Sequence, residues 1–260
     1  MKTNVFIVGN VVEELKKMPS GSVDLIVTSP PYNCGIKYDS WNDSMVWEDY
    51  LKWNKKWLKE CYRVLKDDGR IAINALLEMG IENNTVRVNP QVEFAVMMKQ
   101  VGLNSMGLVL WEDLHRGRYT AWGSWMSASS PYIYNMVECI MLAYKKNRKK
   151  LSAGEDTISK EDFVRGVCGI WKMQPETSGL TKACFPLELP KLLIELLSYK
   201  EDVVLDPFSG SGTTALAAKR TDRKYIGIDI SEEYTRVARK RLAEDRNLFD
   251  WLAESKIGLD

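Results

Sequence analysis

Serine, two prolines and a tyrosine follow a β-branched stretch, Val23–Val27, and have the chemistry to hold an aromatic amine. Pro31 keeps Pro30 extended and neither proline has an N–H group, so the Pro30 carbonyl is a rigid acceptor. The Ser29 hydroxyl adds a second acceptor, and the ring of Tyr32 adds a flat stacking face. Two acceptors beside a stacking face suit an amino group that carries two N–H donors on an aromatic ring.

Such a grip would activate the amine. The lone pair of an exocyclic amino group is delocalised into its ring, and hydrogen bonds that favour a tetrahedral nitrogen make it available to an electrophile. With a sulfonium methyl donor nearby, the methyl group would pass in line to nitrogen and the proton would leave afterwards. No Pro-Cys dipeptide is present for covalent attack on a pyrimidine carbon, which disfavours carbon methylation. A purely structural loop that ends the strand remains an alternative at this point.

A second motif, late in the chain, has the composition of a nucleoside site. Asp206 and a glycine-rich loop lie between an apolar run and a helical pattern. Glycines let the backbone approach a ligand, and the helix N-terminus offers free N–H groups. Asp229 ends the next apolar run, where an acid can accept the two ribose hydroxyls of a nucleoside. The spacing Gly210-x-Gly212-x-x-Ala215 also fits dinucleotide binding or a simple tight turn, so this motif alone leaves those alternatives open.

The apolar pattern supplies strand ends to position both motifs. Strands are expected at 5–8, 23–27, 71–73, 106–111, 132–144, 203–205 and 225–230, and helices at 11–18, 47–65, 92–101, 187–199, 213–220 and 231–243. Strands alternating with helices predict an α/β fold, a doubly wound and mostly parallel sheet covered on both faces. Residues 1–260 are expected to form a single catalytic domain, in which 145–182 interrupt the alternation.

The composition excludes several classes of function. One histidine cannot assemble a His-rich metal site. The five cysteines are scattered and never spaced C-x-x-C, so neither a disulfide framework nor a metal site is expected. A formal net charge of +1 argues against partners that need a strongly charged whole surface. Because no leader pattern or membrane-length apolar run occurs, we expect a cytoplasmic protein without a membrane partner.

Nearly the whole chain resembles the S-adenosylmethionine-dependent DNA amino-methyltransferases of permuted, beta-class motif order. The resemblance is carried by Gly9–Asn10, Ser22–Asn33, Arg63–Arg70 and Phe185–Pro190, and by the glycine loop with its acid. It implies S-adenosylmethionine as cofactor, S-adenosylhomocysteine as product, and a Rossmann-like, circularly permuted, seven-stranded sheet. The implied strand order is 3-2-1-4-5-7-6, with the seventh strand antiparallel. Release-factor and RNA methyltransferases with similar loops resemble the unpermuted order and are therefore disfavoured.

Carried over position by position, the resemblance implies the site residues. Ser29 and Pro30 would grip the amine, and Tyr32 would stack on a base flipped out of the duplex. Asp229 would bind the ribose, and Asn10 stands where the family usually has Asp near the cofactor adenine. The other expected cofactor contacts are Thr28, Phe185, Asp206, Phe208, Ser209, Gly210, Ser211, Gly212, Thr213, Thr214 and Tyr234.

Serine at position 29 resembles the N4-cytosine members of the family more than the N6-adenine members. We therefore expect site-specific methylation of cytosine N4, with adenine N6 as the alternative. An NAD-dependent oxidoreductase and a non-catalytic S-adenosylmethionine-binding protein are more distant alternatives. The expected partners are double-stranded DNA and a cognate restriction endonuclease, with the chain acting as a monomer or homodimer.

The insert 145–182 is the expected target-recognition segment. It holds nine Lys and Arg against five Asp and Glu, a local net charge of +4, which leaves −3 for the remaining chain. Basic side chains neutralise phosphates, so the salt dependence of DNA binding is expected to concentrate there. The expected DNA contacts are Arg116, Arg118, Lys145, Lys146, Arg148, Lys149 and Lys150. A solvated face of lysines is the alternative for the run at 145–150.

Overall fold

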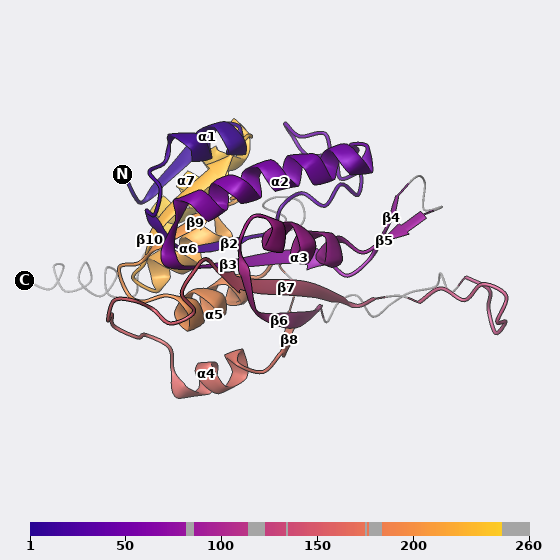
Figure 1. The fold of residues 1–260 in the computed structure, drawn as a ribbon. Helices are drawn as coiled ribbons and strands as arrows, with labels where there is room; N and C mark the ends of the chain where they lie inside the picture. The colour runs from indigo at the N-terminus through magenta and orange to yellow at the C-terminus, as the bar shows by residue number, and fades with distance from the viewer. Residues whose placement is uncertain (82–85, 114–122, 134, 175, 177–183, 246–260) are drawn as a thin grey trace, which may run out of the picture.

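An eight-stranded sheet with helices on both faces organises the chain, as the computed structural model shows (Figure 1). The structure describes residues 1–81, 86–113, 123–133, 135–174, 176 and 184–245. The sheet contains Val5–Val8 (β1), Val23–Thr28 (β2), Leu65–Leu76 (β3), Asn104–Asp113 (β6), Val137–Tyr144 (β7), Ile170–Met173 (β8), Val203–Asp206 (β9) and Lys224–Asp229 (β10). Met79–Ile81 (β4) and Val86–Val88 (β5) pair separately.

The strand order is β1-β10-β9-β2-β3-β7-β6-β8. The strands from β1 to β3 in this order are parallel, and β7 is antiparallel to both β3 and β6. The first seven positions reproduce the expected permuted order with its antiparallel strand. The expectation of seven strands is wrong by one, because Ile170–Met173, inside the 145–182 insert, pairs in parallel with Leu110–Asp113. Part of the insert is thus built into the sheet.

Helices cover the two faces of the sheet in groups of three (Figure 1). One face carries Val11–Lys17 (α1), Trp47–Val64 (α2) and Pro90–Gln100 (α3), and the other carries Glu188–Leu197 (α5), Thr213–Arg220 (α6) and Glu232–Glu244 (α7). A short helix, Lys160–Gly166 (α4), contacts α5. The apolar face of α2 buries Trp57, Leu58 and Cys61 in the first core, as its helical spacing predicts. Within the described residues, every helix is too short or too polar to span a bilayer.

The clearest departure from the expected elements is β3. The pattern predicts a break at residues 67–69, but the strand begins at Leu65 and runs through them. The backbone N–H groups of Lys145 and Lys146, just past β7, donate to the carbonyls of Gly69 and Asp67 at 3.0 and 2.9 Å. Long-range pairing therefore overrides the local turn preference of an Asp-Asp-Gly sequence. The short elements α4, β4, β5 and β8 were likewise not expected.

Candidate active site at the carboxyl edge of the sheet

A cavity opens where the parallel strands end, and both sequence motifs line it. Its empty space, including the part open to solvent, is about 950 Å³. Asn10, Ser29, Asp206 and Asp229 reach it from the ends of β1, β2, β9 and β10. Because carboxyl ends of parallel strands meet at one edge of the sheet, motifs at opposite ends of the sequence come together.

Most positions expected to bind the cofactor lie on the cavity wall. These are Asn10, Phe185, Asp206, Phe208, Ser209, Gly210, Ser211, Thr213, Asp229 and Tyr234. Thr28, Gly212 and Thr214 are not on the wall, and Thr28 and Thr214 are each only 1% exposed. Gly212 has a φ of +77°, and a Cβ there would lie 2.9 Å from Ala238 Cβ. Gly212 is therefore required by the close packing of the loop on α7.

Asp206 is the most strongly perturbed acid of the site. Its Oδ1 accepts a hydrogen bond from Thr28 Oγ1 at 2.7 Å and another from the Phe208 N–H at 3.0 Å. Burial raises the pKa of this carboxyl to about 6, although both hydrogen bonds act to lower it. Asp206 is thus held in one orientation on the wall of the cavity and titrates close to neutral pH.

Asp229 is held by the backbone of the two loops beside it. Its Oδ2 accepts from the Gly210 N–H at 2.8 Å, and its Oδ1 accepts from the Ser231 N–H at 2.8 Å. Burial raises the pKa of Asp229. Each carboxylate oxygen has a second lone pair, so the group can also accept two hydroxyl donors from a ligand. Ser209 Oγ, on the same wall, is buried without a hydrogen-bond partner among the described residues.

Asn10 serves both the cavity and the helix that follows it. It caps α1, where its Oδ1 accepts from the Val12 N–H at 3.0 Å. One lone pair of this oxygen is therefore used by the helix, and the other is available to a donor in the cavity.

Of the Ser-Pro-Pro-Tyr loop, Ser29 and Pro31 line the cavity, whereas Pro30 is buried and neither Pro30 nor Tyr32 lies on its wall. Ser29 lines the cavity, and no donor of the described residues binds the Pro30 carbonyl. The next carbonyl, of Pro31, accepts from Tyr50 OH at 2.7 Å, which fixes the loop to α2. The Tyr32 hydroxyl lies 2.7 Å from Ser29 Oγ.

Two buried polar residues that sequence reasoning missed meet the Tyr32 hydroxyl. Tyr32 OH donates to Glu138 Oε2 at 2.9 Å and accepts from Asn74 Nδ2 at 2.9 Å. Burial, followed by the charge of Glu138, raises the pKa of Tyr32 well above its usual value, so the phenol stays protonated. The available signal was that Asn74 and Glu138 are polar residues in apolar strand sequences, where a buried polar group needs a partner.

The segment after the catalytic loop was missed as well, and it closes one side of the cavity. Tyr38, Ser40 and Trp41 lie on the wall together with Trp53, Cys184, Ile230 and Ser231.

The buried Asp43 carboxylate shapes the segment that follows the Ser-Pro-Pro-Tyr loop by accepting the N–H groups of Asn33, Cys34 and Ile36 at 2.8 to 3.0 Å. Asp39 accepts from Ser231 Oγ at 2.6 Å, and the ring centroids of Trp41 and Trp53 are 4.5 Å apart. These contacts join the segment to α7 and α2.

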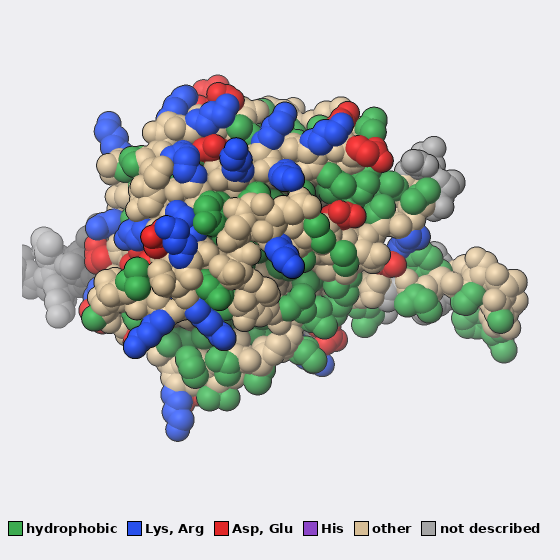
Figure 2. Space-filling view, in the orientation of Figure 1, with side chains coloured by type: hydrophobic (Ala, Val, Ile, Leu, Met, Phe, Trp, Pro, Cys, Tyr) green, Lys and Arg blue, Asp and Glu red, His purple; other side chains and the backbone are tan. Residues whose placement is uncertain are grey.

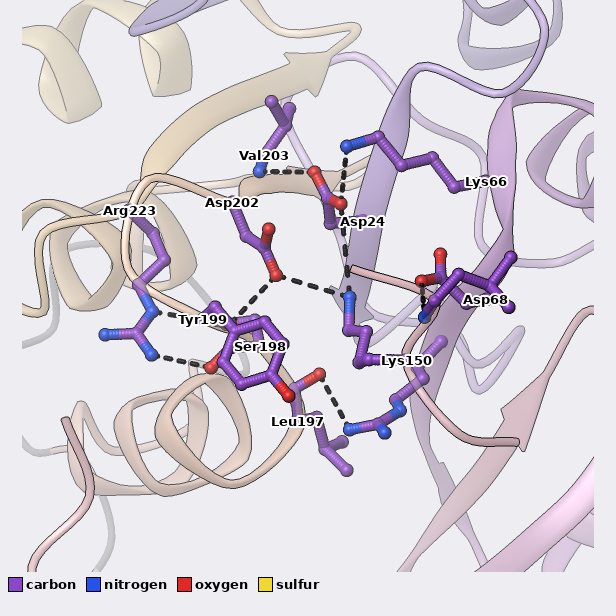
Figure 3. A network of polar contacts seen from close by, with 12 residues as sticks. Asp24, Lys66, Asp68, Lys150, Leu197, Ser198, Tyr199, Asp202, Val203 and Arg223 are labelled. Atoms are coloured by element: carbon purple, nitrogen blue, oxygen red, sulfur yellow. Dashed lines mark hydrogen bonds and ion pairs between the residues drawn. The ribbon is translucent and has the colours of Figure 1, made fainter. Parts of the chain in front are cut away.

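Lys150, the last residue of the basic run at 145–150, points toward Asp24 and Asp202 (Figure 3). Lys150 Nζ lies 3.2 Å from Asp202 and 4.0 Å from Asp24, and its side chain is 5% exposed. Asp24 lies where β2 begins and Asp202 just before β9, whereas the cavity lies where these strands end. Lys145 Nζ donates to the Leu65 carbonyl at 2.8 Å in the interior. These internal contacts occupy both ammonium groups, so the structure does not support the expectation that Lys145 and Lys150 contact phosphates.

The remaining basic candidates have different positions. Lys146 pairs with Asp67 at 3.0 Å, and Arg148 and Lys149 are exposed at the edge remote from the cavity. Arg116 and Arg118 lie outside the described residues. On the face seen in Figure 2, Lys and Arg lie mostly over the upper and left parts with some acidic side chains among them, and hydrophobic side chains dominate on the right. Among the described residues of the run at 145–150, none lines the cavity.

Comparison with known proteins identifies the family. Residues 23–240 match the family described as DNA methylase. The chain is 30% identical over 266 residues to Type II methyltransferase M.HpaI of Haemophilus parainfluenzae, an alignment covering 95% of this chain and 77% of that protein. It is 40% identical over 161 residues to Type II methyltransferase M.MjaVI of Methanocaldococcus jannaschii, covering 62% of this chain and 81% of the relative.

Solved structures agree with this assignment. A DNA modification methylase of Thermus thermophilus, complexed with S-adenosyl-L-methionine, superposes with a TM-score of 0.74 at 27% identity, with 92% of each chain covered. PvuII DNA methyltransferase (cytosine-N4-specific) shares the fold, with a TM-score of 0.72 at 19% identity over 98% of this chain and 91% of its own. The oxidoreductase alternative for the glycine loop is not supported by these relatives. This chain belongs to the N6/N4 DNA methylase family.

Proposed function

We propose that this protein is a site-specific DNA methyltransferase that uses S-adenosylmethionine to methylate cytosine N4 in double-stranded DNA. The observation that carries the proposal is that Ser29 lines the same cavity as Asp206 and Asp229. The residue proposed to accept the amine and the residues proposed to bind the nucleoside therefore line one continuous cavity. When bound, S-adenosylmethionine supplies an activated methyl group.

The donor and acceptor groups of the cavity fit this cofactor. The two carboxylate oxygens of Asp229 can accept the ribose hydroxyls, and the unpartnered Ser209 hydroxyl offers a further polar contact. The ionised Asp206 carboxylate suits the cationic amino group of the methionine moiety. The aromatic side chains of Trp41, Trp53 and Phe208 give the cavity apolar walls for the rest of the molecule.

The catalytic loop would hold the target amine by its two N–H groups. Ser29 Oγ and the Pro30 carbonyl each accept one of them, which draws the nitrogen lone pair out of the ring and toward the methyl donor. A base inside a duplex cannot reach this cavity, so the target must be flipped out of the stack. Tyr32 is proposed to pack against the flipped base with its ring, because its hydroxyl is anchored by Ser29, Asn74 and Glu138.

DNA must meet the carboxyl edge of the sheet, because the cavity opens there. Residues 123–133 project from this side, and β4 and β5 lie nearby (Figure 1). Trp125, Met126 and Ile133 are exposed by 69, 89 and 73%. The Arg87 guanidinium lies 4.9 Å above the Tyr132 ring and links the projecting segment to β5. We propose that these elements, with Arg116 and Arg118 between them in the chain, approach the duplex.

The target base is decided by analysis of the product. DNA methylated by the purified protein is digested to nucleosides and measured by mass spectrometry, and N4-methylcytosine is expected. Serine rather than aspartate at position 29 supports cytosine. Detection of N6-methyladenine alone would establish the adenine alternative, and detection of neither base would overturn the methyltransferase assignment.

The biological setting is part of the proposal. The relatives are named Type II methyltransferases, which supports a cytoplasmic role beside a cognate restriction endonuclease. The chain is proposed to act as a monomer or a homodimer, which light scattering of the purified protein distinguishes.

A further inference from the structure

A buried carboxylate on β7 ends a hydrogen-bonded chain that starts at the cavity. Ser29 Oγ lies 2.7 Å from Tyr32 OH, and Tyr32 OH lies 2.9 Å from Glu138 Oε2. Asn74 Nδ2 donates to both Tyr32 OH, at 2.9 Å, and Glu138 Oε2, at 2.6 Å. Glu138 and Asn74 are 5% and 3% exposed. Side chains from the catalytic loop, β3 and β7 thus form one connected network.

The carboxylate sets the direction of every hydrogen bond in this chain. An ionised carboxylate only accepts, so Tyr32 must donate its single hydrogen to Glu138. The Tyr32 oxygen then has only acceptor capacity left, and it receives Asn74 Nδ2 on one side. On the other side it must receive the Ser29 hydroxyl hydrogen. Ser29 Oγ is consequently left with lone pairs alone for the cavity that it lines.

The direction matters for an incoming amine. If Ser29 donated its hydrogen into the cavity, it would bind the nitrogen lone pair that has to attack the methyl group. If Ser29 only accepts, it binds an N–H group and leaves that lone pair free. A negative charge at Glu138, two side chains away, is what distinguishes the two cases.

We propose that Glu138 is a positioning residue that makes Ser29 an obligate acceptor and that receives the proton released after methyl transfer. This inference rests on the proposed amino-methyltransferase function. Methyl transfer forms the N–C bond, breaks the C–S bond and leaves the nitrogen with a surplus proton. That proton passes from nitrogen to Ser29 Oγ as the Ser29 hydrogen passes to Tyr32 and the Tyr32 hydrogen to Glu138. One proton enters the chain and one carboxylic acid forms, so atoms and charge balance.

The test compares Glu138→Gln and Tyr32→Phe in single turnovers at saturating DNA and cofactor. Each variant is expected to slow methyl transfer by about 100-fold, the lower end of what a positioned proton-transfer group contributes. The Kd for S-adenosylmethionine, measured by calorimetry, is expected to stay within about twofold, because neither residue lines the cavity. The double variant is expected to be no slower than the slower single variant, because either change breaks the same chain.

A matched control and a folding check accompany the test. Glu112 lies on the neighbouring strand β6 and pairs with Lys172 at 3.2 Å, so Glu112→Gln removes a nearby charge outside the network. This control is expected to transfer methyl groups at the wild-type rate. Thermal unfolding identifies a variant that fails to fold, in which case Tyr32→Phe, which keeps the ring, carries the comparison.

Three outcomes separate the inference from the function on which it rests. Wild-type transfer rates in Glu138→Gln would overturn the inference while leaving the function intact. Multiplying losses in the double variant would also overturn it, because they would show two independent effects. Absence of methyl transfer by the wild-type protein would instead overturn the proposed function. The inference is supported if the single variants transfer methyl groups more slowly with unchanged cofactor affinity, and if the double variant is no slower than the slower single variant.

Discussion

Thr28 Oγ1 donates to Asp206 Oδ1 at 2.7 Å, and this bond joins the two halves of the active site. Thr28 ends β2, which leads into the Ser-Pro-Pro-Tyr loop, and Asp206 ends β9, which leads into the glycine loop. The strands are direct neighbours in the sheet. A shift of either loop would stretch a buried hydrogen bond to a carboxylate, so this contact helps to fix the relative position of the two loops.

The first prediction is that cofactor affinity depends on pH through Asp206. The pKa of Asp206 is raised to about 6, and a cationic amino group binds its ionised form. Affinity should therefore be highest above pH 7 and fall about tenfold by pH 5, as the carboxyl takes up its proton. Thr28→Val removes a hydrogen bond that favours the charged form, so it should move this loss to higher pH. Calorimetry across this range measures both effects.

Asp206→Asn is the control for this prediction. It should bind S-adenosylmethionine more weakly at pH 7 and show a flat profile between pH 5 and 7. A profile in Asp206→Asn that still falls below pH 6 would assign the titration to another group, of which Asp229 is the nearest candidate, because its pKa is also raised.

The second prediction separates catalysis from cofactor binding. Ser29→Ala removes an acceptor for the amine but no group that holds Asp229, so it should slow transfer by at least about tenfold with cofactor affinity nearly intact. Asp229→Ala removes the expected ribose acceptor and the partner of two backbone N–H groups, so it should weaken cofactor binding at least about tenfold. Calorimetric losses of equal size in both variants would contradict this division.

The third prediction concerns the basic run. Lys150→Ala removes the cation beside Asp202, whereas Asp24 keeps Lys66 at 2.6 Å, so the variant should lower the free energy of unfolding by about 2 kcal/mol. Its DNA affinity at fixed salt should match the wild type, because the ammonium group is buried at the edge away from the cavity. Lys149→Ala, an exposed neighbour, should change stability by less than about 0.5 kcal/mol. A reduced salt dependence of DNA binding in Lys150→Ala would restore the phosphate role.

The sheet could be anticipated from the sequence because its strands are short, β-branched and separated by helices with regular spacing. Val5–Val8 and Thr213–Arg220 have the predicted bounds, and α2 differs by one residue. The edge strand β8 could not be anticipated, because Ile170–Met173 is short and its pairing partner lies about 60 residues earlier. Such elements depend on tertiary contacts more than on local propensity.

Short contiguous motifs, the glycine loop and the Ser-Pro-Pro-Tyr loop, allowed part of the cavity lining to be predicted from the sequence. The residues missed by sequence reasoning act from a distance. Glu138 reaches Tyr32 from a strand more than a hundred positions away, and Asp39 reaches Ser231 from the other end of the chain. The prediction for the basic run failed to account for distant contacts in the same way. The sequence does not reveal that Lys150 is buried beside Asp24 and Asp202.

The fourth prediction concerns the hydrogen-bonded network that joins Ser29, Tyr32 and Glu138. Ser29→Asp places a second carboxylate beside a tyrosine hydroxyl that already donates its only hydrogen to Glu138. Two carboxylates would then compete for one hydrogen in a buried network, and their like charges would repel. Transfer should fall by at least about tenfold in Ser29→Asp and recover in part in Ser29→Asp/Glu138→Gln, because the amide removes one charge and can donate a hydrogen. Single-turnover rates of the wild type and the three variants measure this pattern. A double variant no faster than Ser29→Asp would show that Glu138 does not act on position 29 through Tyr32.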